Sequence, residues 1–132
     1  MAVYKQIAYA SASSGTTVET MTNAFEVPTD FTEFAIQVPA LLGVTATIGV
    51  QVYGATSNVT FTSFFPVYYP NAVGTVTSNS LISIWQSPNS AACLGGFVVC
   101  EALKYCPGWA RFHFTATMTM LTGITVYGRK YD

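Results

Sequence analysis

Apolar and polar residues alternate along two stretches of this 132-residue chain. In residues 44–53, one face holds Val44, Ala46, Ile48, Val50 and Val52, and the other holds Thr45, Thr47 and Gln51. Residues 110–119 repeat the pattern, with Ala110, Phe112, Phe114, Ala116 and Met118 opposite Arg111, His113, Thr115, Thr117 and Thr119. A period of two is typical of a β-strand with one buried face and one polar face. Both stretches are therefore predicted to be strands of antiparallel sheets.

Further segments are rich in Val, Ile, Thr, Phe and Tyr, the residues that suit a pleated surface. They cover residues 4–10, 16–21, 31–38, 59–65, 80–85, 96–102 and 124–127. Gly and Pro separate them, for example at Pro28, Gly54 and Pro107. The best candidate for a helix is the short stretch 100–105.

This layout predicts an all-β fold, a single-domain β-sandwich that is jelly-roll-like, with about eight to nine antiparallel strands over residues 1–132. The two alternating strands and the last one supply the predicted core residues. These are Ile48, Val50, Val52, Phe112, Phe114 and Ile124.

Charged residues make up only 8% of the chain, against roughly a quarter in typical soluble domains. The formal net charge is −1, so copies of the chain repel one another weakly. We expect other subunits to cover much of the surface; the alternative is a monomer coated with Thr and Ser.

The five basic residues do not cluster as nucleic-acid binding requires. Polar residues interrupt the apolar run 34–52, so no membrane helix is expected. Residues 1–6 have no signal-peptide pattern, so synthesis in a cytoplasm is expected.

The titratable residues show no catalytic motif. His113, the only histidine, lies on the polar face of its predicted strand, and a surface or interface role is preferred. Glu26, Asp30 and Glu33 flank a turn containing Pro28 and are expected to be solvated. Glu101 shares a predicted strand face with Phe97 and Val99, so we expect it to be buried in an ion pair with Arg111 or Lys104; a catalytic acid is the alternative. No catalytic residue is predicted, and the chain is not expected to be an enzyme.

The three cysteines, Cys93, Cys100 and Cys106, are spaced by seven and six residues. Zinc sites usually contain a closer pair such as Cys-x-x-Cys, so neither a metal nor another cofactor is predicted. Buried thiols acting as small hydrophobes are favoured. A disulfide is the alternative if the protein matures outside a cell.

The sequence from Phe64 to Pro70 places aromatic rings on both faces of an extended segment, since neighbouring strand residues point in opposite directions. Some of these rings should therefore meet another surface. We predict an interface formed by Phe64, Phe65, Tyr68 and Tyr69. A neighbouring subunit is the favoured partner because the whole chain is poor in charge, and a glycan stacked on the rings is the alternative.

The C-terminal third carries a recognisable pattern. The run Trp109-Ala110-Arg111-Phe112-His113-Phe114, a Thr-rich turn and the run Ile124-Thr125-Val126-Tyr127-Gly128 resemble the closing hairpin of small phage virion proteins. The run Phe34-Ala35-Ile36-Gln37-Val38-Pro39 fits the same family of β-sandwich head-decoration or tail-associated proteins. Galactose-binding-like jelly rolls end in a comparable strand pair. The motifs cover about half of the chain and exclude the cysteines and residues 64–69.

The resemblance implies a viral structural protein, a capsid decoration or accessory virion subunit. It would be made in the host cytoplasm and located in the virion, where it would stabilise the particle through contacts between subunits. Its expected partners are further copies of itself, with a trimer as one natural symmetric arrangement, and other virion proteins such as the major capsid protein. The alternative function is a carbohydrate-binding or host-attachment module. The resemblance carries no catalytic residue to this chain.

Overall fold

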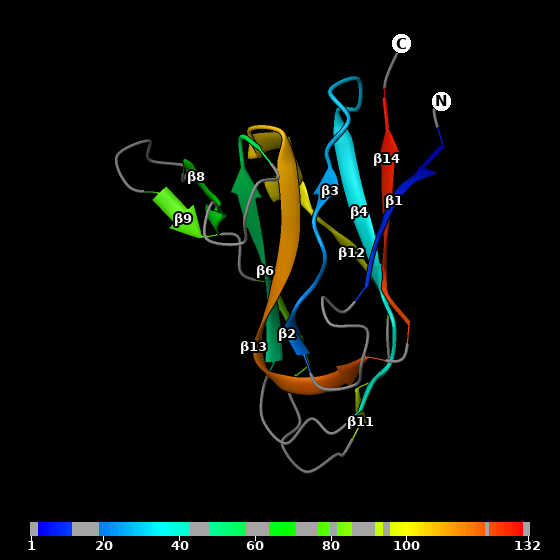
Figure 1. Ribbon diagram of the computed structural model, residues 1–132. Helices are drawn as coiled ribbons and strands as arrows, with labels where there is room; N and C mark the ends of the chain where they lie inside the picture. Colours follow the sequence, from blue (N-terminus) through cyan, green and yellow to red (C-terminus); the bar gives the residue numbers. More distant parts are fainter. Residues whose placement is uncertain are drawn as a thin grey trace.

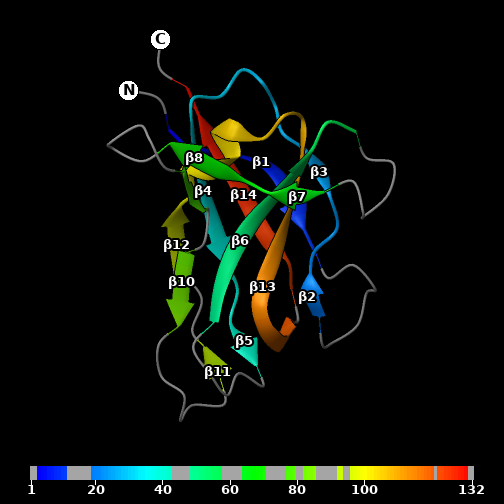
Figure 2. The same cartoon turned by 90° about the vertical axis from the view of Figure 1, so that its left-hand side faces the viewer.

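The computed structural model describes residues 3–11, 19–42, 48–57, 64–70, 77–79, 82–85, 92–93, 96–120 and 122–130. Two antiparallel sheets pack face to face, as Figure 1 and the orthogonal view in Figure 2 show. The predicted all-β sandwich of antiparallel strands is confirmed.

The first sheet has four strands in the order β1 (Lys5–Ala10), β14 (Ile124–Arg129), β4 (Glu33–Val38) and β12 (Gly96–Val99). Both chain ends contribute to it, because β1 pairs with β14 from Lys5↔Gly128 to Ala10↔Ile124. The strand β12 lies at one edge and pairs with β4 from Gly96↔Val38 to Val99↔Ala35. We call this the four-stranded sheet.

The larger sheet is built around the long strand β13 (Trp109–Met120), which pairs with β6 (Ile48–Ala55). Three short strands pair with β13, namely β2 (Glu19–Met21), β3 (Phe25–Glu26) and β5 (Leu41–Leu42). Two pair with β6, namely β7 (Phe65–Pro66) and β10 (Ile82–Trp85), and β11 (Ala92–Cys93) pairs with β5. A separate two-stranded ladder joins β8 (Tyr68–Pro70) to β9 (Thr77–Asn79).

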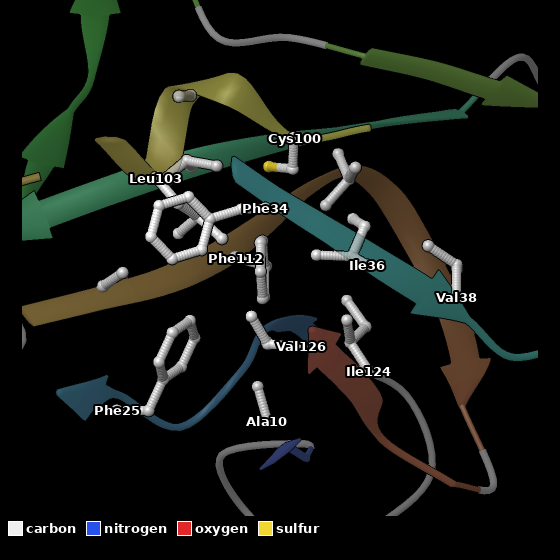
Figure 3. Packing of buried hydrophobic residues seen from close by; sticks show 14 of the residues in the cluster. Ala10, Phe25, Phe34, Ile36, Val38, Cys100, Leu103, Phe112, Ile124 and Val126 are labelled. Carbon is white, nitrogen blue, oxygen red and sulfur yellow. The ribbon is translucent and has the colours of Figure 1, made fainter. Parts of the chain in front are cut away.

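The core lies between the sheets and follows the alternation of the sequence. Figure 3 shows Ile36 and Val126 of the four-stranded sheet facing Phe112 of the larger sheet. Phe25 packs on Phe112 with 5.6 Å between ring centroids. All six predicted core residues are at most 1% exposed, which confirms that prediction.

The predicted strand 96–102 is wrong at its end. The strand β12 stops at Val99, and residues Glu101–Tyr105 form the 3-10 helix η2. The stretch 100–105, the best candidate for a helix, therefore contains this short 3-10 helix. It turns Ala102 and Leu103 into the core and leaves Glu101 exposed, so the prediction of a buried Glu101 ion pair is also wrong.

Several predicted strands extend beyond the described residues. Residues 16–18, 44–47, 59–63 and 80–81 belong to predicted strands and lie outside the part of the chain that the structure describes. The strands predicted at 4–10, 31–38, 110–119 and 124–127 are present as β1, β4, β13 and β14.

Candidate interaction surfaces

The predicted interface segment divides between the interior and the surface. Phe64 is only 5% exposed, so its prediction as an interface residue is wrong. It covers Arg111, whose guanidinium carbon lies 5.7 Å from the centre of the Phe64 ring. Phe65 and Tyr68 are 68% and 53% exposed, and the side chain of Tyr69 lies outside the described part of the structure. Pleating accounts for the difference between Phe64 and Phe65, because consecutive residues of an extended segment face opposite sides. The alternation is interrupted at the buried Val67, between β7 and β8, so Tyr68 is exposed as well.

The exposed rings of Phe65 and Tyr68 share a hollow with a third ring, that of Tyr105 in η2. Phe65, Tyr68 and Tyr105 line one hollow of about 380 Å³, together with Gly54 and Pro107. Tyr105 is also largely exposed. We call Phe65, Tyr68 and Tyr105 the β7–β8 surface. The sequence did not indicate Tyr105, since its approach depends on η2 folding back toward β8.

A second apolar surface lies on the outer face of the four-stranded sheet. Phe97 and Val99 of β12 are 70% and 66% exposed. They line a hollow of about 360 Å³ with Tyr4, Ala35, Val98 and Tyr127. The rings of Phe97 and Tyr127 lie 5.8 Å apart at an interplanar angle of 50°. We call Phe97, Val99 and Tyr127 the β12 surface.

Polar groups border the β12 surface. The Tyr127 hydroxyl donates a hydrogen bond to Oε1 of Gln37 at 3.1 Å. Nε of Arg129 donates to Oε2 of Glu33 at 2.7 Å, and its guanidinium carbon lies 4.6 Å from the centre of the Tyr4 ring. This surface was not among the interfaces predicted from the sequence. The signal was the run Phe97-Val98-Val99, which is apolar on both faces although it lies at a sheet edge.

The polar face of β13 is more enclosed than the alternation predicted. Arg111 is 2% exposed beneath Phe64. His113 is half-buried, and its ring lies 5.3 Å from that of Tyr53. Burial, and then the nearby positive charge of Arg111, lower the pKa of His113 below its usual value of 6.5. Its Nδ1 atom is buried and has no hydrogen-bond partner among the described residues. A neutral imidazole packed on a tyrosine ring fits a structural role.

Cys100 and Cys106 are free thiols near the two ends of η2. Cys100 is buried, as expected of a small hydrophobe, and the side chain of Cys93 lies outside the described part. Burial raises the pKa of both thiols to about 12. Cys106 lines a further hollow of about 510 Å³ with Lys104 and Phe31. Because its thiol stays protonated at neutral pH, Cys106 is a poor nucleophile there.

No group of three or more metal-ligating residues occurs among the residues that the structure describes. Within the same residues, no helix is long and apolar enough to cross a membrane. The chain matches no protein-family model, no curated protein and no solved structure. The two apolar surfaces are therefore the features of the molecule that bear on its function.

Proposed function

We propose that this chain is a structural subunit that assembles with further copies and with other proteins of a virion, as a decoration or accessory protein, and has no catalytic role. The observation that carries the proposal is the grouping of exposed aromatic residues into the β7–β8 and β12 surfaces. Soluble monomers rarely expose large contiguous apolar patches, and such patches usually mark interaction sites.

The energetics favour assembly over a free monomer. At about 25 cal/mol per Å², covering a patch of a few hundred Å² contributes several kcal/mol before the entropy of association is subtracted. With 8% charged residues and a net charge of −1, the chain opposes close packing of its copies only weakly. Repetition of such contacts over a particle makes individually weak contacts collectively strong.

The viral part of the proposal rests on the resemblance of the strands β4, β13 and β14 to small phage virion proteins. Mass spectrometry of purified particles of the virus that encodes the chain tests it. We expect the chain to be a regular component of intact particles. Its absence from particles, together with its presence in the surrounding lysate, would overturn a virion role.

Charge placed on the β7–β8 surface tests assembly. Phe65→Asp combined with Tyr68→Asp should reduce the sedimenting mass of the purified chain, because a carboxylate is costly to bury in an apolar contact. Lys130→Ala is the control: Lys130 is exposed and pairs with Asp30 only at 3.9 Å. Equal masses for both variants and the wild type would exclude this surface from assembly.

A carbohydrate-binding role is the second candidate, favoured by Phe97 and Tyr127 beside the amide of Gln37 on the outer sheet face. Aromatic rings next to an amide can stack on a sugar and hydrogen-bond to its hydroxyls. Titration with galactose- and glucose-containing oligosaccharides, followed by NMR, should then shift resonances of Phe97 and Tyr127. Tyr127→Ala should abolish the shifts and Phe65→Ala should leave them unchanged. A spectrum that millimolar sugar does not alter would remove this candidate.

A further inference from the structure

The strand β12 forms one edge of the four-stranded sheet, and its backbone shows which residues face outward. Among the described residues, β12 pairs with β4 alone. The register runs from Gly96↔Val38 to Val99↔Ala35, and the next residue, Cys100, donates its N–H to the carbonyl of Phe34 at 2.9 Å.

That hydrogen bond fixes the direction of the other backbone groups. Hydrogen-bonded and non-hydrogen-bonded pairs alternate along an antiparallel ladder. Since Cys100 bonds to Phe34, Val98↔Ile36 is a hydrogen-bonded pair and Val99↔Ala35 is not. The N–H and C=O groups of Phe97 and Val99 therefore point away from β4, toward the edge of the sheet. The side chains of these two residues are also the most exposed in the strand.

The opposite edge of the sheet differs. The strand β1 begins with the exposed Lys5, and its ladder with β14 is interrupted by a register shift between Gln6 and Ala8. A charged residue and a bulge are common means by which edge strands avoid pairing with other chains. The sequence of β12, Gly-Phe-Val-Val, has no charge and no proline, and its register with β4 is unbroken.

We infer that β12 pairs antiparallel with β12 of a second copy, about a two-fold axis at Val98. This inference rests on the proposed assembly function and names the contact. Phe97 of each copy then exchanges backbone hydrogen bonds with Val99 of the other, and the four-stranded sheets join into one continuous sheet. On the outer face, Phe97 of one copy lies beside Val99 of the other and covers it.

A second copy fits this edge because the edge complements itself. The two-fold pairing matches the outward N–H and C=O groups of Phe97 with those of Val99, and an isologous contact uses one patch on both partners. The strand carries no charge that would select an unlike partner or repel an identical one.

The direction of the backbone groups gives a test specific to the edge. Val99→Pro removes an N–H that points outward and leaves the hydrogen bonds to β4 in place, which an edge strand tolerates. Val99→Thr is the matched control, since it keeps the N–H and the branched side chain. In sedimentation equilibrium, we expect Val99→Pro to weaken dimerisation at least about tenfold and Val99→Thr to leave it within about twofold of the wild type.

Disulfide crosslinking determines the register between the two β12 strands. It remains informative even if the Val99→Pro variant does not fold. Phe97→Cys protein is mixed with Val99→Cys protein under mild oxidation, and linked peptides are identified by mass spectrometry. Facing residues in an antiparallel pair lie within the range that a disulfide spans. We expect a disulfide that joins positions 97 and 99 of different copies.

Dimers that form equally well with Val99→Pro, or a mixture without the 97–99 link, would overturn the β12 pairing. If such a chain still assembles or is still found in particles, the proposed function stands. A wild-type chain that is monomeric and absent from particles would overturn both.

Discussion

The two faces of the four-stranded sheet carry apolar residues in opposite surroundings. On the inner face, Phe34, Ile36 and Val126 are buried against the larger sheet. On the outer face, Phe97 and Val99 are mostly exposed, and Tyr127 lies beside them. Alternation accounts for the inner face, because folding removes those side chains from water. The outer residues gain little from folding, so their apolar character is better explained by contact with a partner.

The largest expected difference between the inner and outer faces is in how much a substitution lowers the free energy of unfolding. Phe112→Ala should lower the free energy of unfolding by about 3–5 kcal/mol, because it removes a fully buried ring and leaves a cavity. Phe97→Ala should change it by no more than about 0.5 kcal/mol in the monomer, as expected for an exposed site. Urea unfolding of both variants measures the contrast. Similar losses would show that the outer face is part of the folding core.

The adjacent residues Phe64 and Phe65 allow a second comparison of a buried ring with an exposed one. Phe64→Ala should cost about 3 kcal/mol, since Phe64 is buried over Arg111. Phe65→Ala should leave thermal unfolding nearly unchanged, since its ring is exposed. If Phe65→Ala proved the more damaging substitution, the division of residues 64–68 between interior and surface would be wrong.

The ion pair at the border of the outer face should contribute little to stability. Glu33→Gln removes the carboxylate that pairs with Arg129, and we expect a loss of less than about 1 kcal/mol in the free energy of unfolding, because both side chains are partly exposed. The loss should shrink further at high salt, where surface charges are screened. A loss as large as that of Phe112→Ala would contradict the view that apolar packing dominates.

The smallest expected effect concerns pH. The folded pKa of His113 lies below the unfolded value of 6.5, so the unfolded chain binds more protons as the pH falls below that value. The free energy of unfolding should therefore decrease slightly as the pH falls from 6.5 toward the pKa of His113 in the folded chain. His113→Gln should flatten this part of a melting-temperature profile.

We also expect His113→Ala to leave assembly intact; loss of a measured turnover in a folded His113→Ala protein would contradict the non-enzymatic role.

Short-range pattern predicted the interior well and the surface poorly. The burial of Val50, Val52 and Phe114 follows from a period of two, which local sequence displays directly. The burial of Arg111 depends on Phe64, which is distant in the sequence. The exposure of Glu101 depends on the start of η2, which ends the period of two after Val99. The β12 surface depends on how the sheets pack, because Phe97 and Val99 lie on the face of the four-stranded sheet that is turned away from the core.

Sedimentation equilibrium of the wild-type chain over a range of salt concentrations tests the central claim most directly. The claim is that charge-poor, apolar surfaces drive assembly. We predict a mass greater than the 14.2 kDa of one chain at micromolar concentration, with little change as salt is raised, because few ion pairs are available to screen. A mass of one chain at every concentration and every salt level, together with absence from purified particles, would contradict the claim.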